Sequence, residues 1–152
     1  MNISIRKMMA ADLEKVVAID QLSFSLPWPD SAFSTELNNP DARCWVVCED
    51  ETVVGFVVIW LVLDEAHVAT IAIDEPYRGK GYSAALLKRA LQSAYLEGSR
   101  IGYLEVRESN QVAISMYHSF GFEVAGLRKE YYKDNHENAL LMTMTNFSRI
   151  NE

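Results

Sequence analysis

The sequence has little of several features that would each point to a particular class of protein. Two of its 152 residues are cysteine and four are proline, and it contains no internal repeat and no low-complexity tract. Its longest apolar run, Val53 to Leu63, stops at Asp64, far short of the roughly 20 residues that a membrane helix needs. No apolar stretch of signal-peptide length separates Arg6 and Lys7 from Asp12, so we expect neither a signal peptide nor a membrane anchor.

Basic charge is also scarce. There are 14 Lys+Arg residues against 21 Asp+Glu, a formal net charge of -7. Nucleic-acid binding depends on Lys and Arg that neutralise phosphates, so this balance argues against a nucleic-acid partner. A hydrophobic content of 49% with 23% charged residues is typical of a globular protein. At roughly 100–200 residues per domain, the length predicts a single domain over residues 1–152.

The two cysteines are predicted to be unpaired. Cys44 and Cys48 fall in one predicted strand, which places them on the same face about 13 Å apart at ~3.3 Å per residue. A disulfide needs Cα atoms within about 7 Å. Free cysteines favour a reducing, cytoplasmic setting. The three histidines, His67, His118 and His136, show no metal-ligand spacing, so we expect no metal site.

What the sequence does contain is a clear alternation of strand and helix patterns. Hydrophobic periodicity predicts the order β-α-α-β-β-β-α-β-α-β-β. A strand, a long helix and a strand within residues 67–107 form a βαβ crossover, which joins parallel strands. The fold class is therefore α/β with a mixed sheet. We expect strands over residues 3–6, 44–49, 52–63, 67–74, 101–107, 122–132 and 137–147, and helices opening at Asp12, at Asp30 or Ser31, after the loop 75–81 and at Asn110.

Two residues mark the ends of the predicted helices. Gly98 stands where a glycine commonly ends a helix, just after the long apolar stripe. Asn110 is a favourable N-cap for the next helix. The expected buried face of that helix holds Val112, Ala113, Met116 and Tyr117.

The stretch Arg78–Ser83 lies between a predicted strand and the start of the long helix. Free backbone N–H groups and the helix dipole favour an anion at such a position. Gly79 and Gly81 allow close approach of the backbone, and Arg78 and Lys80 add positive charge. The stretch is neither a P-loop nor a complete dinucleotide fingerprint. The alternative interpretation is an ordinary glycine-rich turn before an amphipathic helix.

The same stretch is similar to a known cofactor loop. Arg78-x-x-Gly81-x-Ser83 resembles the Arg/Gln-x-x-Gly-x-Gly/Ala loop of the GCN5-related N-acetyltransferases, with a serine at the last position. The order of elements matches that family over nearly the whole chain. The resemblance implies acetyl-CoA as cosubstrate and a central pair of parallel strands that splay apart to admit the thioester. It implies that backbone groups bind the cofactor at Ile71, Ala72, Ile73, Arg78, Gly79, Lys80, Gly81, Tyr82 and Ser83.

Glu105 and Tyr117 are the candidate proton carriers. A parallel strand is usually apolar on both faces, so Glu105 in the strand 101–107 needs an explanation. It either accepts a proton from an incoming amine or lies on a partly solvated face with Tyr103 and Arg107. Tyr117 either packs in the core or protonates a leaving thiolate, because a phenol with a pKa near 10 is protonated at neutral pH.

Around these residues the sequence is similar to one particular group within that family. The pattern Leu-Glu-Val-Arg-x-Ser-Asn-x-x-Ala-x-x-x-Tyr over residues 104–117 is similar to the bacterial ribosomal-protein-alanine N-acetyltransferases. Leu26-Pro27-Trp28 and the run over residues 128–132 match the same family. It implies Glu105 as proton acceptor, Tyr117 as proton donor at the cofactor thiol, Asn110 near the cofactor, and direct attack of the amine with no acyl-enzyme.

The acceptor side is the least defined part. Trp28, Tyr131 and Tyr132 are candidates, although packing in the core is an equally good interpretation. Adjacent tyrosines on a strand point to opposite faces, so at most one of the pair would contact a substrate.

The resemblance implies a protein N-terminus as acceptor, an alanine of a basic ribosomal protein, with the enzyme a monomer or weak dimer in the cytoplasm. The alternatives are acetylation of a small amine, such as a polyamine or aminoglycoside, and a CoA-binding module without catalysis.

Charge is unevenly distributed along the sequence. Residues 1–75 carry 4 bases and 13 acids, whereas residues 76–152 carry 10 bases and 8 acids. One interpretation is that the basic half faces the polyanionic cofactor and the acidic half attracts a cationic acceptor. The alternative is an uneven surface charge without a functional meaning.

Overall fold

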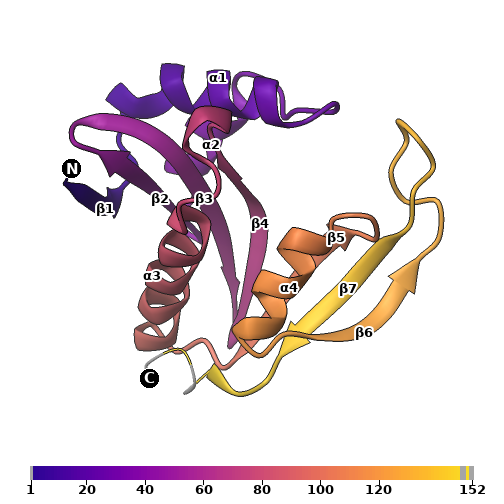
Figure 1. Ribbon diagram of the computed structural model, residues 1–152. Helices are drawn as coiled ribbons and strands as arrows, with labels where there is room; N and C mark the ends of the chain where they lie inside the picture. Colours follow the sequence, from indigo (N-terminus) through magenta and orange to yellow (C-terminus); the bar gives the residue numbers. More distant parts are fainter. Residues whose placement is uncertain (1, 148–149, 151–152) are drawn as a thin grey trace. The chain divides into compact units, whose positions relative to one another are not determined.

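The computed structural model describes residues 2–147 and residue 150. Within these residues the strands form a mixed sheet in the order β1-β2-β3-β4-β5-β7-β6 (Figure 1). The chain divides into two compact units, a first unit of residues 1–60 and 69–90 and a second unit of residues 61–68 and 91–152. The predicted domain 1–152 includes positions 1, 148–149 and 151–152, which lie outside the described residues.

The first unit is a strand meander with helices. Its elements are strands β1 (Ile3–Lys7), β2 (Ala42–Glu49), β3 (Thr52–Val62) and β4 (Glu65–Ile73), helices α1 (Leu13–Ser23), α2 (Ala32–Leu37) and α3 (Tyr82–Leu96), and 3-10 turns Ala10–Asp12 and Glu75–Tyr77. The ends of β3, β4 and α3 belong to the second unit. Antiparallel pairing aligns Arg6 of β1 with Val46 of β2, and Val46 with Phe56 of β3.

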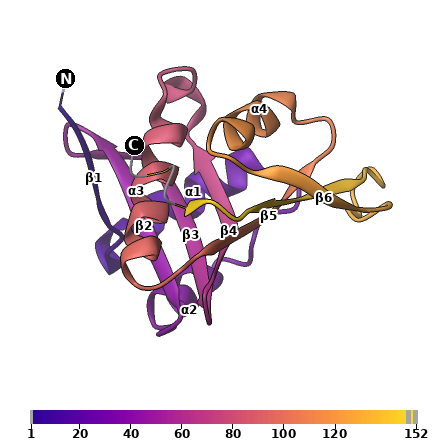
Figure 2. The same cartoon turned by 90° about the horizontal axis from the view of Figure 1, so that it is seen from below.

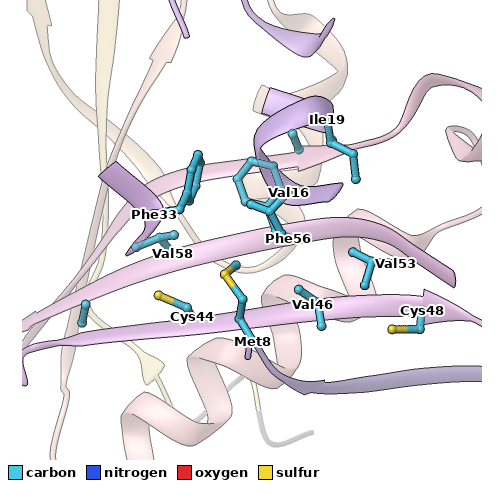
Figure 3. Close-up of a cluster of buried hydrophobic side chains, with 12 residues drawn as sticks. Met8, Val16, Ile19, Phe33, Cys44, Val46, Cys48, Val53, Phe56 and Val58 are labelled. Atoms are coloured by element: carbon cyan, nitrogen blue, oxygen red, sulfur yellow. The ribbon is translucent and has the colours of Figure 1, made fainter. Parts of the chain in front are cut away.

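Alternation along the strands buries both faces of this unit. One face of β2 and β3 packs against α1 and α2, as Figure 3 shows for Val46, Phe56 and Phe33. On the other face of β2, the ring of Trp45 lies 5.2 Å from the Arg89 guanidinium of α3. The helices therefore cover the strands from two sides, which excludes water from nearly every side chain of β2.

The two cysteines are part of this core. Cys44 and Cys48 lie on the same face of β2 (Figure 3), both buried and both free, so the predicted absence of a disulfide is confirmed. Burial raises the pKa of the Cys44 thiol to about 11. A buried, protonated thiol is a packing group rather than a nucleophile.

The second unit is built around a parallel strand pair and an antiparallel extension. It contains β5 (Ile101–Arg107), α4 (Gln111–Ser119), β6 (Glu123–Arg128) and β7 (Ala139–Met144). Residues 65–68 of β4 pair in parallel with residues 101–104 of β5, which confirms the predicted crossover. Strand β7 pairs antiparallel with both β5 and β6, and α4 lies along one side of β5 and β6 (Figure 2).

Helix ends follow the predicted signals closely. Gly98 has a φ of 109°, and Ser99 donates its N–H to the carbonyl of Ala94, which closes the end of α3. The side chain of Asn110 accepts the N–H of Ala113 at 3.2 Å, so its capping role is confirmed. The start of α2 is different, because Ser31 is the N-cap residue but its side chain makes no capping bond.

Two predictions about the second unit are wrong. Val112 is 86% exposed, so it is not part of the buried face of α4. The last two strands are also shorter than the predicted 122–132 and 137–147, because β6 ends at Arg128 and β7 begins at Ala139 and ends at Met144. The chain leaves the ladder at Glu130, whose φ is 50° and whose N–H bonds the side chain of Asn138.

Candidate active site

The loop before α3 has an open backbone. Gly79 and Gly81 have φ values of 80° and 82°, and a Cβ at either position would meet no atom within 4 Å. The first helical bond runs from Ala85 N–H to the carbonyl of Gly81, and the N–H groups of a first helical turn have no partner inside their helix. Free amides, a helix N-terminus and open space at both glycines fit a pyrophosphate.

Arg78 holds this loop in place with its side chain. Its Nε donates to the carbonyl of Ile73 at 2.8 Å, and a terminal nitrogen donates to Ser23 Oγ at 3.2 Å. The guanidinium therefore joins the end of β4 to the last residue of α1. Arg78 thus anchors the loop as well as adding charge to it.

An acid that the sequence analysis did not select lies beside the same loop. Glu49, at the end of β2, accepts a 2.5 Å hydrogen bond from the Tyr82 hydroxyl and lies 3.4 Å from Lys80 Nζ. The bond to Glu49 raises the pKa of Tyr82 to about 12, and the Tyr82 hydroxyl holds the pKa of Glu49 below its usual value. Lys80 also lies 5.4 Å from the ring centre of Tyr77. The position of Glu49 in an acidic turn of the sequence gave no sign of its contacts with Tyr82 and Lys80.

The strand β4 supplies the other residues expected to bind the cofactor. Ala72 and Ile73 are 8% and 7% exposed, and Ile71 is half-buried. A Cβ at Gly55 of β3 would lie 2.9 Å from the Ala72 carbonyl oxygen, so only glycine allows the two strands to pack this closely. Ser83, the second residue of α3, is half-buried.

In the second unit, Glu105 lies on the more solvated face of β5. Leu104 and Val106 are buried on one face, whereas the Glu105 side chain on the other is 33% exposed. Its Oε1 lies 3.6 Å from Nε of Arg128. This is the solvated face considered above, and it leaves the carboxylate accessible to a substrate. The role of Glu105 as proton acceptor stays a prediction.

Tyr131 and Tyr132 lie in the loop between β6 and β7, not on a strand. The expectation that they point to opposite faces was therefore wrong, and their rings meet edge to face at 5.2 Å. The charge of Glu105 raises the pKa of Tyr131, which places that phenol beside the carboxylate. Tyr132 is half-buried, with the Arg107 guanidinium 4.0 Å from its ring centre, and burial raises its pKa to about 12.

Tyr117 lies inside the same unit. It is 6% exposed, and its ring contacts Phe122 edge to face at 5.9 Å. Burial, and the nearby phenol of Tyr132, raise the pKa of Tyr117 to about 12. Its phenol is therefore protonated throughout the physiological range, as a general acid must be. Both the packing role and the proposed proton-donating role fit this environment, and the latter stays a prediction.

A charged network that the sequence analysis missed holds the loop of the two tyrosines. Arg107 bonds Asp134 at 2.8 Å and lies 3.5 Å from Glu137. Glu137 in turn accepts the N–H of Ser109 at 2.7 Å, and hydrogen bonding by the side chain and the N–H of Ser109 holds the pKa of Glu137 below its usual value. Arg107 belongs to the basic half of the sequence, which is expected to face the cofactor. In the structure it fastens the β6–β7 loop to the end of β5.

Trp28 belongs to the first unit and is half-buried. Its ring stacks on Trp60 at 6.2 Å with 9° between the planes, and it lies 5.0 Å from Phe33. Trp28 packs against the hydrophobic core of that unit. Packing thus accounts for part of its position, and contact with a substrate stays a prediction.

The predicted site residues fall into one group in each unit. The first unit contains Trp28, Ile71–Ile73 and the loop Arg78–Ser83. The second contains Glu105, Asn110, Tyr117, Tyr131 and Tyr132. No group of three or more His, Cys, Asp or Glu in the described part of the chain is arranged to hold a metal ion. Nor does any helix among residues 2–147 have the length and apolar character to cross a membrane.

Known proteins resemble this chain over most of its length. Residues 13–122 match the model of the acetyltransferase (GNAT) family. The chain is 38% identical over 143 residues to the putative [ribosomal protein bS18]-alanine N-acetyltransferase of Bacillus subtilis (strain 168), covering 93% of this chain and 95% of the relative. It is 30% identical over 143 residues to the [ribosomal protein bS18]-alanine N-acetyltransferase of Escherichia coli (strain K12), covering 93% and 96%.

The fold agrees with these relationships. The crystal structure of the ribosomal-protein-S18-alanine N-acetyltransferase from Escherichia coli superposes with a TM-score of 0.88 at 29% identity, covering 95% of each chain. The family match spans strands β2 to β5, the glycine loop, Glu105 and Tyr117. The chain belongs to the acetyltransferase (GNAT) family, and it is an N-acetyltransferase.

Proposed function

We propose that this enzyme transfers the acetyl group of acetyl-CoA to the α-amino group of a protein N-terminus, specifically an alanine of a ribosomal protein. The observation that carries the proposal is the environment of two residues of the second unit. Glu105 is an accessible carboxylate at the end of β5, and Tyr117 is a buried, protonated phenol on the following helix. The names and coverage of the two relatives described above support the choice of acceptor.

The first unit would hold the cosubstrate. Backbone amides from Arg78 to Ser83 would bind the pyrophosphate, because the glycines leave the backbone accessible and the helix N-terminus favours negative charge. Backbone groups of Ile71–Ile73 would bind the pantetheine arm. Acetyl-CoA supplies an activated thioester carbonyl, and Asn110, the N-cap of α4, would lie near the cofactor.

The second unit would move the protons. The free amine attacks the thioester carbon, the C–N bond forms, the C–S bond breaks, and CoA leaves as thiolate. Glu105 takes the proton from the amine, directly or through water, and Tyr117 protonates the sulfur. An α-ammonium has a pKa of only about 7.7–8.0, so a weak base suffices to deprotonate it. No acyl-enzyme is needed, and the buried Cys44 and Cys48 supply no nucleophile.

The substrate side would consist of Trp28, Tyr131 and Tyr132. Tyr131 lies beside the Glu105 carboxylate, which supports its contact with the incoming N-terminus. We further propose that the enzyme acts in the cytoplasm, which the two free cysteines support, and as a monomer or weak dimer.

A panel of acceptors tests the proposal. The protein is incubated with acetyl-CoA and with peptides that differ in their first residue, together with spermidine and an aminoglycoside, and acetyl addition is read by mass spectrometry. We expect peptides that begin with alanine to be acetylated fastest, at the α-amino group. Acetylation of the small amines with none on any peptide would overturn the proposed acceptor, and CoA binding without any transfer would overturn the enzyme.

A further inference from the structure

Asp20 is a buried carboxylate on the apolar face of α1. It lies near the end of α1 on the face that carries Val16 and Ile19, and it is 1% exposed. Burial raises the pKa of its carboxyl. A buried polar group is unfavourable unless it is hydrogen-bonded, so its partner indicates why it is there.

That partner is the backbone of Trp28. The Trp28 N–H donates to Asp20 Oδ2 at 3.0 Å. Pro27 and Pro29 flank Trp28 and carry no N–H, so Trp28 has the one amide hydrogen of this three-residue stretch. The stretch lies between α1 and α2, outside any strand ladder, and a buried N–H there needs a side-chain acceptor.

The next residue of α1 fastens the same loop at a second point. Gln21 Nε2 donates to Asp30 Oδ1 at 2.7 Å. Two consecutive side chains of α1 therefore hold the loop on both sides of Pro29, Asp20 at the Trp28 backbone and Gln21 at the Asp30 side chain. The ring of Trp28 is in turn fixed between Phe33 and Trp60, and the Trp60 indole donates to Glu36.

We propose that Asp20 is a positioning residue that sets the acceptor-binding conformation of the loop 24–31 through the amide of Trp28. This inference rests on the proposed function, because Trp28 is there assigned to the acceptor side. When the loop is already ordered, binding of the acceptor does not carry the entropic cost of ordering the loop. Loss of the bond at Asp20 then weakens the binding of the peptide more than it slows the transfer, and it leaves CoA binding unchanged.

Matched variants separate hydrogen bonding from shape and charge. Leucine at position 20 keeps the approximate shape of aspartate but cannot accept a hydrogen bond, whereas asparagine keeps both the shape and an acceptor oxygen. Asp12→Ala is the control. Asp12 is also a buried aspartate of the first unit, and it accepts a backbone N–H, that of Met9, at 2.8 Å. Asp12 fastens the start of α1 rather than the loop of Trp28.

The measurements are the KM for an alanine-initiated peptide, the Kd for CoA, and the near-ultraviolet circular dichroism of the Trp28–Trp60 pair, with Trp60→Phe as spectral reference. We expect Asp20→Leu to raise the peptide KM about tenfold, to alter the tryptophan signal and to change the CoA Kd less than twofold. Asp20→Asn stays near wild type in all three, and Asp12→Ala changes neither the KM nor the tryptophan signal.

Failure of the inference and failure of the proposed function look different. Should a folded Asp20→Leu keep the wild-type KM, Asp20 does not position the acceptor loop. If Asp20→Leu does not fold, Asp20→Glu moves the carboxylate by one methylene and is expected to raise the peptide KM in the same way; a wild-type KM there overturns the inference. A wild-type enzyme that acetylates no peptide, with a tryptophan signal that still depends on Asp20, would refute the proposed function and leave the anchoring of Trp28 standing.

Discussion

The predicted site residues of the first unit offer backbone groups, whereas those of the second unit offer side chains. In the loop Arg78–Ser83 the open groups are amides and glycines, while the side chains of Arg78, Lys80 and Tyr82 are engaged with neighbours. In the second unit the proposed chemistry depends on side chains, the carboxylate of Glu105 and the phenol of Tyr117.

The difference predicts what mutations do. A site made of backbone groups binds its ligand through the conformation of the chain. Substitutions in the first unit are therefore expected to change the affinity for CoA when they strain the backbone. A side-chain site acts through protonation, so substitutions in the second unit change the rate. Binding of CoA and the turnover number therefore respond to different units.

Replacement of Glu105 is the largest expected effect. We expect Glu105→Gln to lower kcat about 10²-fold or more at neutral pH, because the amide cannot take a proton from the amine, a contribution typically of 10²–10⁴. The CoA Kd, measured by calorimetry, stays within twofold of wild type. Glu123→Gln is the control, because its side chain is 74% exposed on β6. A rate for Glu105→Gln equal to that control would remove Glu105 from the reaction.

Tyr117→Phe is expected to follow, with a kcat lower by about tenfold to 10²-fold. Burial raises the pKa of the phenol to about 12, so Tyr117 is protonated at every pH from 6 to 9. The defect is therefore constant over that range, and the pH–rate profiles of variant and wild type are parallel.

Tyr95→Phe is the control for this experiment, since Tyr95 is another tyrosine of the second unit that packs against a phenylalanine ring, that of Phe147, at 6.1 Å. A fully active Tyr117→Phe would return Tyr117 to a packing role. A defect that disappears at one end of the pH range would assign the proton donor to another group.

Local rules account for the features of the fold that could be predicted from the sequence. The bounds of β5, the cap at Asn110 and the glycine end of α3 at Gly98 all depend on residues within a few positions of each other. The glycine loop is predictable for the same reason, because positive φ is a property of single residues.

Features that depend on distant side chains could not be predicted. The run of β-forming residues near Tyr131 and Tyr132 favours a strand, but Asn138 and the pairing of Arg107 with Asp134 hold this segment as a loop. Glu49 beside Tyr82 joins residues 33 positions apart. Pairs of this kind follow from tertiary packing, which periodicity does not encode.

Substitutions at two glycines, Gly81 and Gly98, test whether the loop Arg78–Ser83 binds CoA through its backbone. Gly81→Ala places a Cβ at a φ of 82°, which costs roughly 1–2 kcal/mol although no atom lies within 4 Å. We expect about a fivefold to tenfold rise in the CoA Kd, with kcat at saturating CoA nearly unchanged.

Gly98→Ala is the matched control. Gly98 has a φ of 109° and equally open surroundings, but it ends α3 rather than beginning it. Both variants lose comparable thermal stability, and only Gly81→Ala loses affinity for CoA. Equal CoA affinity in the two variants would mean that the loop binds through its side chains instead.

The two units have similar net charges. The halves of the sequence carry net charges of -9 and +2, but the first unit has 8 bases and 11 acids, or -3, and the second has 6 bases and 10 acids, or -4. Folding thus mixes the charges that the sequence separates. The expectation that a basic half faces the cofactor and an acidic half faces the acceptor stays a prediction.

The smallest effect is therefore expected from ionic strength. Raising NaCl from about 50 to about 300 mM lowers kcat/KM for a basic alanine peptide only about twofold, because long-range attraction is screened and neither unit dominates it. Two double variants sharpen the comparison: Glu14→Gln with Asp41→Asn in the first unit, and Glu97→Gln with Glu123→Gln in the second. All four side chains belong to exposed residues. A similar loss of the salt effect in both double variants follows from the similar net charges of the units, -3 and -4. Loss in the first alone would make the acidic half of the sequence the source of the attraction.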